Sequence, residues 1–369
     1  MSKKVRHLLG ISGGKDSTAL TIYMRNNYPE LDIEYYFCDT GKELEETYSL
    51  INELEIFLGK KIKLLRAAEK SNEEPFDHFL KIYGGYLPSS QARWCTKNLK
   101  LEPFEKYIGN DLVISYVAIR GDEDREGYIS TKPNIQTVFP FRKNIWSIEI
   151  LNAILGNGNI SKVAELYTSF ASETITKRAI EIIFTPTSDN FFFSQKVNAL
   201  LDLSVKTFNK VVFEFLKDTD YPIANLNDFP LIENEEIIVM EDVKKLFKEN
   251  GVTFPRYYNE VEYEVKGQKG KYARSRSGCF FCFYQQKIEW VWLYERHPQL
   301  FEKAMEYEKD GYSWNENERL DELIKPGRIK QIKGEHLKKI RNKILSVKSN
   351  KLIDVLDDKE GVSCINCFV

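Results

Sequence analysis

A short loop near residue 12 has the residue types of an anion-binding site. It consists of Ser12, Gly13, Gly14, Lys15, Asp16 and Ser17. The loop follows an apolar run at 5–11 and precedes a stretch with helical spacing, so backbone N–H groups and the positive end of a helix dipole meet there. Glycines let a phosphate approach the backbone, serine hydroxyls can donate hydrogen bonds, and lysine neutralises charge. The pattern predicts a phosphate-binding loop.

Asp16 is the unusual member of this loop, because a carboxylate beside a phosphate site needs a partner of its own. It can hold Mg²⁺, or it can orient a neighbouring loop. The loop differs from the Walker A pattern, in which Gly-x-x-x-x-Gly-Lys precedes the Ser or Thr. The sequence therefore predicts a nucleotide site of another class.

Further charged residues follow other predicted strands. Asp39 comes after the apolar run at 33–38, where open α/β sheets bind ligands, and it can contact ribose or adenine. Arg120 follows the run at 112–119 and is the best candidate for bidentate phosphate binding. Positive charge for phosphates also comes from Arg93, Lys97 and Lys100. Each alone is an ordinary surface charge, but their co-occurrence predicts a nucleotide site.

Several short motifs resemble, in kind and order, those of one nucleotide-binding family. Besides the loop at 12–17 they are Phe37-Cys38-Asp39-Thr40-Gly41, Glu45-Glu46-Thr47-Tyr48, Arg93-Trp94-Cys95-Thr96, Ala118-Ile119-Arg120-Gly121-Asp122-Glu123 and Gly278-Cys279-Phe280-Phe281-Cys282. The loop resembles the PP-loop of ATP pyrophosphatases, the adenine nucleotide α-hydrolases. The later motifs resemble the phosphoadenosine phosphosulfate reductase-like branch. The resemblance covers about 1–140 and 235–310, and the block between them resembles an insertion.

The resemblance implies an activity. In that family the loop grips the pyrophosphate end of ATP while the α-phosphate is attacked, so a substrate oxygen would displace pyrophosphate and become adenylated. A sulfur nucleophile would then displace AMP. The implied catalytic residues are Lys15, Asp16 and Arg120, which act with Mg²⁺ and the helix N-terminus through positioning and charge neutralisation.

The cysteines include two pairs with metal-ligand spacing, Cys279-x-x-Cys282 and Cys364-x-x-Cys367. One interpretation is Zn²⁺ on these four. The other is a 4Fe-4S cluster on Cys95, Cys279, Cys282 and one thiolate of the later pair. We favour the cluster, because Cys95 lies in a nucleotide-proximal motif and the resembling proteins include iron-sulfur members. The later pair can instead relay sulfur as a persulfide.

The segment 325–351 is strongly basic. It carries ten Lys or Arg and a single acid, Glu335, which gives a net charge of +9. Such a run is either a solvated helix face or a contact to the phosphates of a nucleic acid, because closely spaced cations release condensed counterions on binding. The second interpretation predicts DNA-backbone binding without sequence specificity.

The branch, the cysteines and the basic segment together most resemble the ATP pyrophosphatase components of DNA phosphorothioate modification in Dnd and Ssp systems. The activated oxygen there is a non-bridging oxygen of the DNA backbone. The resemblance implies a cysteine desulfurase or another sulfur donor, and other modification-system proteins, as partners.

Three alternatives remain open. A sulfonucleotide reductase fits a nucleophilic cysteine in the late segment, but Cys95-Thr96 replaces the adjacent Cys-Cys pair of cluster-bearing reductases and the Glu-Cys-Gly context is absent. A nucleotide-sensing module would dock a partner on the helical block at 146–216. An RNA thiolation enzyme is also compatible, since the phosphate loop does not specify the acceptor.

The elements that position these residues are those of an α/β protein. Apolar runs at 5–11, 33–38, 62–65 and 112–119 alternate with helical stretches, which predicts a doubly wound parallel sheet. Beyond 139 the pattern is mainly helical. We therefore expect a nucleotide-binding domain at 1–140, a helical insertion at 141–234, the remainder of the family domain with its CxxC pair at 235–310, and a basic, helical C-terminal region at 311–369.

Composition narrows the class of protein. With 42% hydrophobic and 13% aromatic residues, the 369-residue chain can bury a substantial core. No run approaches the ~20 apolar residues of a membrane helix, and the first six residues are too few and too charged for a signal peptide. These features predict a cytoplasmic protein with no membrane partner.

Overall fold

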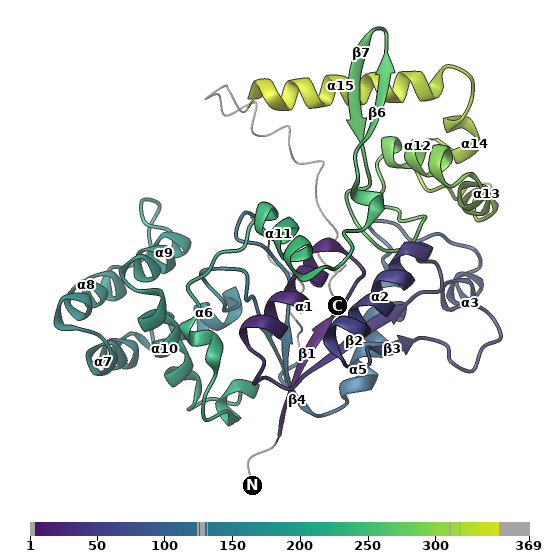
Figure 1. The fold of residues 1–369 in the computed structure, drawn as a ribbon. Helices are drawn as coiled ribbons and strands as arrows, with labels where there is room; N and C mark the ends of the chain where they lie inside the picture. The colour runs from purple at the N-terminus through teal and green to yellow at the C-terminus, as the bar shows by residue number, and fades with distance from the viewer. Residues whose placement is uncertain are drawn as a thin grey trace.

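Five parallel strands form a sheet in the first part of the chain (Figure 1). The structure is a computed structural model and describes residues 4–123, 125, 130, 132–309, 311–316 and 318–346. The strands are β1 (Val5–Gly10), β2 (Ile33–Asp39), β3 (Lys63–Arg66), β4 (Leu112–Tyr116) and β5 (Ile135–Val138). Their order in the sheet is β3-β2-β1-β4-β5, and every neighbouring pair is parallel.

Helices cover both faces of this sheet. One face packs against α1 (Lys15–Asn27) and α2 (Glu45–Leu58), and the other packs against α5 (Glu102–Ile108). Side chains alternate between the faces as the strand pleat requires. Leu9 lies in the core with α1, whereas Leu8 lies in the core with α5. The predicted α/β class with a doubly wound parallel sheet is confirmed.

The strand order reverses direction between β1 and β4. The chain moves outward from β1 through β2 to β3, and then returns to the other side of β1 with β4 and β5. In open α/β sheets, ligands bind outside the carboxyl ends of the strands at such a switch point. The loops that follow β1 and β4 are therefore the expected place of a site.

Shorter elements connect β3 to β4. They are α3 (Pro75–Ile82), α4 (Trp94–Thr96) and the π-helix η1 (Lys97–Leu101), which continues directly into α5. Strand β4 ends at Tyr116, three residues before the predicted end, because the chain turns tightly there and the Ile119 N–H bonds the Val117 carbonyl at 3.1 Å. Strand β5 was not predicted from the sequence.

The stretch after β5 is helical, as predicted. It contains α6 (Ile148–Ile154), α7 (Ile160–Phe170), α8 (Glu173–Phe184), α9 (Phe193–Leu203) and α10 (Val205–Leu216), followed by the 3₁₀ helices η2 (Pro222–Asn225) and η3 (Pro230–Glu233). The apolar stripe of α9 and α10 belongs to the same hydrophobic core as the α1 face of the sheet. These helices therefore extend the core of the sheet.

The later part of the chain combines helices with a hairpin. Its elements are α11 (Met240–Asn250), η4 (Arg256–Tyr258), β6 (Val261–Val265), β7 (Gln268–Tyr272), α12 (Lys287–Arg296), α13 (Pro298–Glu306), α14 (Leu320–Leu323) and α15 (Arg328–Ser346). The antiparallel β6-β7 hairpin, absent from the sequence prediction, packs with α12 and α15 in a second core that also includes Phe76 and Trp94 (Figure 1). None of the described helices is both long and apolar enough to span a bilayer.

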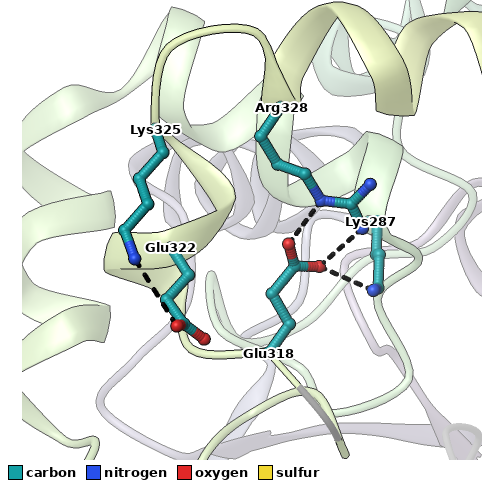
Figure 2. A pocket seen from close by; sticks show the side chains of 5 residues that line it. All are labelled: Lys287, Glu318, Glu322, Lys325 and Arg328. Carbon is teal, nitrogen blue, oxygen red and sulfur yellow. Dashed lines mark hydrogen bonds and ion pairs between the residues drawn. The ribbon is translucent and has the colours of Figure 1, made fainter.

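The basic helix α15 is held at its start by Glu318. This carboxylate binds Lys287 of α12 at 2.6 Å and the guanidinium of Arg328, while Lys325 pairs with Glu322 at 3.5 Å (Figure 2). Part of the predicted positive charge of 325–351 is thus neutralised by acids outside that segment. Residues 347–351 of the segment lie outside the described residues.

Candidate nucleotide-binding site

The loop at 12–17 lies at the switch point of the sheet, between β1 and α1. Gly14 is the N-cap of α1, and as a glycine it has no side chain to cap this helix end. Gly13 has φ of +71°, and a Cβ on Gly13 would lie 2.4 Å from Cγ2 of Thr47. Only glycine accommodates both the backbone conformation and this close approach. The loop therefore points the N-terminal N–H groups of α1 toward the carboxyl edge of the sheet.

Hydroxyl groups line the loop. The Ser12 N–H donates to Oγ of Ser17 at 3.1 Å, and the two serine hydroxyl oxygens are 3.1 Å apart. The Gly14 N–H donates to Oγ of Ser12 at 3.3 Å. These bonds fix the loop in one shape while Ser12 and Lys15 remain partly exposed. The arrangement has the donors of the predicted phosphate site.

Asp16 and Arg120 form a buried ion pair across the switch point. Nη1 of Arg120 is 2.5 Å from Oδ1 of Asp16, and the side chains are 10% and 8% exposed. Arg120 also binds Asp122 at 2.8 Å and Glu123 at 3.2 Å. Although burial lowers the pKa of Arg120, the carboxylates of Asp16 and Glu123 raise it above the ordinary value. Asp16 thus orients the loop after β4, the second of its two predicted roles.

The same contacts bear on the predicted Mg²⁺ ligand. Oδ1 of Asp16 faces Arg120, and Oδ2 lies 3.4 Å from Nζ of Lys15. Both carboxylate oxygens are therefore occupied by cations, and Asp16 does not fit a direct Mg²⁺ ligand in this conformation. We derive no step through a metal held by Asp16.

Asp39 lies at the carboxyl end of β2, as predicted, but its oxygens are used within the protein. Oδ1 accepts the Gly41 N–H at 2.9 Å and the Tyr48 hydroxyl at 2.8 Å, and Oδ2 lies 3.3 Å from Nε of Arg66. Asp39 therefore shapes the loop after β2. Ribose or adenine contact by Asp39 stays a prediction.

The three other predicted cations are dispersed. Arg93 donates to the Ser90 carbonyl at 3.0 Å and lies 5.5 Å from the ring centroid of Tyr284. Lys97 is 71% exposed and pairs with Glu102 at 4.0 Å. Lys100 lies in η1, and its carbonyl accepts the Cys38 thiol at 3.7 Å. Arg120, in contrast, contacts the loop at 12–17 directly through Asp16.

Three residues beside the loop were not predicted: Tyr257, Tyr258 and Ser277. The Tyr257 hydroxyl donates to the Gly13 carbonyl at 2.5 Å, and the Lys15 N–H donates to the Tyr258 hydroxyl at 3.4 Å. Oγ of Ser277 is 3.5 Å from Oγ of Ser12. The only sequence signal was the position of Ser277 just before the CxxC motif, since tyrosines and serines in loops form no distinctive pattern.

The cysteine region does not form a metal centre within the part of the chain that the structure describes. It contains no group of three or more His, Cys, Asp or Glu side chains that could hold a metal ion. Sγ of Cys279 lies 3.1 Å from the Thr40 hydroxyl, and burial, aided by Glu43, raises the pKa of Cys279 well above its ordinary value. Cys279 thus bonds the loop after β2 through its thiol.

The predicted cluster on Cys95, Cys279 and Cys282 therefore has no support in the described geometry, and no chemistry is derived from it. The proposed further ligands Cys364 and Cys367 lie outside the described residues. The alternative Zn²⁺ site needs all four cysteines of the two pairs, so it likewise has no support in the described geometry.

Comparison with known proteins agrees with the position of the loop. Residues 6–140 match the family model of the phosphoadenosine phosphosulfate reductase domain. The match supports a relationship between this chain and the PP-loop ATPase superfamily. It includes the PP-loop at 12–17 and the strand end that holds Arg120, and it suggests an ATP-using enzyme.

Three curated proteins are similar in sequence to parts of this chain. The chain is 28% identical to the tRNA-specific 2-thiouridylase MnmA of Sulfurimonas denitrificans over 243 residues, 62% of this chain and 69% of that protein. It is 33% identical to the uncharacterized protein MJ0066 of Methanocaldococcus jannaschii over 153 residues, 38% of this chain. It is 28% identical to the uncharacterized protein MJ0973 of the same organism over 158 residues. The matches span only 30% and 36% of the two archaeal proteins.

Proposed function

We propose that this protein is an ATP pyrophosphatase that adenylates a substrate oxygen so that sulfur can replace it. The observation that carries the proposal is the PP-loop at the switch point, with Lys15 and Arg120 converging there from β1 and β4. The N-terminus of α1, a lysine and serine hydroxyls are the kinds of donor that a leaving pyrophosphate requires.

The proposed reaction has two steps. A substrate oxygen attacks the α-phosphorus of ATP, the bond to the β-phosphate oxygen breaks, and pyrophosphate leaves. ATP enters as its Mg²⁺ complex. The protein stabilises the leaving pyrophosphate through Ser12, Lys15 and the N-terminus of α1, and Asp16 holds Arg120 beside it. A sulfur nucleophile then attacks the adenylated centre and AMP departs with the oxygen.

For the acceptor we propose a non-bridging oxygen of the DNA backbone. The basic helix α15 supports this choice, because Lys330, Lys338 and Arg341 are exposed on it. A cysteine desulfurase or similar donor would supply the sulfur, and other modification proteins would complete the system. These partners follow from the choice of acceptor.

A second candidate acceptor is RNA. The similarity to a tRNA-specific 2-thiouridylase over 62% of this chain favours it. In that case the oxygen to be replaced would lie on a nucleobase, and α15 would bind the phosphates of the RNA instead. Incubating the protein with duplex DNA or tRNA, together with ATP and a sulfide source, and locating the incorporated sulfur distinguishes the two acceptors.

The experiment that tests the activity follows pyrophosphate released from labelled ATP. We expect Ser12→Ala and Lys15→Ala to reduce the release by at least about a hundredfold, because each removes a donor to the developing charge. Lys60→Ala is the matched control, since Lys60 pairs with Asp32 near the amino end of β2. Unchanged release in both loop variants would refute the site. Thiol-dependent sulfite release from a sulfonucleotide would point instead to a reductase.

A further inference from the structure

The segment after the helical stretch reaches back to the PP-loop. The Phe280 N–H donates to the Lys42 carbonyl at 2.9 Å, and the Arg274 N–H donates to the Tyr257 carbonyl at 3.0 Å. The Tyr257 hydroxyl in turn bonds the Gly13 carbonyl at 2.5 Å. These contacts fix the segment on the loop, although about 240 positions separate them in the chain. Side chains of this segment are therefore held in place at the phosphate site.

Ser277 extends the row of serine hydroxyls on the loop. Its Oγ is 3.5 Å from Oγ of Ser12, which is 3.1 Å from Oγ of Ser17. A Cβ on Gly14 would lie 2.7 Å from Oγ of Ser277. Gly14 has an ordinary φ of −82°, so its backbone conformation does not require glycine. Glycine is needed here because its missing side chain leaves room for the Ser277 hydroxyl. Three hydroxyls thus line one side of the loop.

Tyr258 meets the loop at its lysine. The Tyr258 hydroxyl accepts the Lys15 N–H at 3.4 Å, and Nζ of Lys15 lies 4.5 Å from the centroid of the same ring. The hydroxyl can donate its own proton as well, and burial raises the pKa of Tyr258. Ser12, Lys15, Tyr258 and Ser277 are all partly exposed, so an anion can reach them together.

We propose that the hydroxyl groups of Tyr258 and Ser277 bind the pyrophosphate end of ATP beside Ser12 and Lys15, an inference that rests on the proposed function. The later segment then adds two donors to those of the loop at 12–17. Both hydroxyls donate to phosphate oxygens, and the ring of Tyr258 holds the lysine ammonium over the same anion.

The test uses the full chain and three probes: inorganic pyrophosphate, AMP and Mg²⁺-ATP. Tyr258→Phe removes the hydroxyl and keeps the ring under Lys15, and Ser277→Ala removes the second hydroxyl. We expect each variant to weaken pyrophosphate binding about tenfold in calorimetry and to raise KM for Mg²⁺-ATP similarly, since each loses a hydrogen bond to a charged group. AMP binding stays unchanged, which a general loss of structure would not allow.

Two substitutions serve as matched controls. Tyr263→Phe removes a hydroxyl of the β6-β7 hairpin that bonds His336 of α15. Ser275→Ala removes an exposed serine close to Ser277. Neither should change pyrophosphate binding. The proposal is overturned if Tyr258→Phe and Ser277→Ala bind pyrophosphate as tightly as the unaltered chain. If the unaltered chain binds pyrophosphate but releases none from ATP, the proposed reaction fails while this inference stands.

Discussion

The buried pair of Asp16 and Arg120 is the residue-scale feature on which the site depends. Removing Arg120 takes away the cation that the carboxylates of Asp16, Asp122 and Glu123 share. We expect Arg120→Ala to lower the free energy of unfolding by about 3 kcal/mol, because a buried charge loses its partner. Asp16→Asn should lower the free energy of unfolding by less. In the double variant the loss should be smaller than the sum of the two single losses by at least about 1 kcal/mol.

Urea denaturation of the four proteins in this cycle measures the coupling. The matched control is the cycle for Glu173 and Lys177, an exposed pair four residues apart on α8. Its coupling should not exceed about 0.5 kcal/mol. If the buried pair couples no more strongly than the exposed pair, Asp16 does not position Arg120, and the assignment of its role is wrong.

At this scale the sequence predicted the residues that lie close along the chain. The PP-loop and Arg120 could be found because they follow apolar runs at strand ends, which neighbours in the chain reveal. Tyr257, Tyr258 and Ser277 could not, since their contact with the loop spans more than two hundred positions. Asp39 was placed at the correct strand end, but its bonds to Tyr48 and Arg66 arise only in the folded chain.

At the scale of elements, Glu318 anchors the start of α15, while Lys333 of the same helix pairs with Glu295. The hydrogen bond from Arg328, reinforced by Lys287, lowers the pKa of Glu318 to about 2 (Figure 2). A depressed carboxylate pKa contributes stability above its ordinary value of 4.5, and this contribution is lost as the pH falls toward about 2. Acid should therefore loosen the start of α15.

Glu318→Gln tests this attachment. We expect it to cost about 1 kcal/mol near neutral pH, because Arg328 and Lys287 lose a charged acceptor. The difference from the unaltered chain should shrink as the pH falls from about 5 toward about 2, because Glu318 is protonated in the unfolded chain before it is protonated in the folded one. Denaturant unfolding at a series of pH values measures it. Glu322→Gln, at the more exposed pair with Lys325, should show a smaller difference at every pH.

The elements differ in how well the sequence reported them. The helical character of α9 and α10 was predicted, because periodicity is a local signal, but their separation at Ser204 was not. The β6-β7 hairpin was not, since Glu262, Glu264 and several lysines dominate its strands and only Tyr263, Val265 and Tyr272 are buried. Its stability comes from packing on α12 and α15, which the local pattern does not contain.

The whole molecule separates its charges. Outside 325–351 the chain carries 43 basic and 54 acidic residues, whereas that segment has a net charge of +9. The structure divides the segment further: Arg328 and Lys333 bind Glu318 and Glu295, so they are neutralised. The exposed cations Lys330, Lys338 and Arg341 have no acidic partner within the described residues. We propose these three as the contacts to a nucleic-acid backbone.

These three cations lie on one flank of α15. At 100° per residue, positions 330, 338 and 341 fall within an arc of about 80° and span about 16 Å, so they can contact successive phosphates of one strand. We expect the triple alanine variant to bind duplex DNA at least about tenfold more weakly and to flatten the dependence of affinity on salt by roughly one unit of slope per residue. ATP-dependent pyrophosphate release should stay unchanged, because the flank lies outside the PP-loop site.

The control for net charge is the triple variant of Lys244, Lys245 and Lys248, which removes three exposed lysines from α11. It changes the total charge by the same amount and should leave DNA binding and its salt dependence unaltered. Equal losses in both triple variants, measured by fluorescence anisotropy across a salt series, would show that net charge alone governs binding and would refute a site on α15. Repeating the salt series with tRNA tests the RNA alternative in the same way. The nucleic acid that α15 binds more tightly is the favoured acceptor.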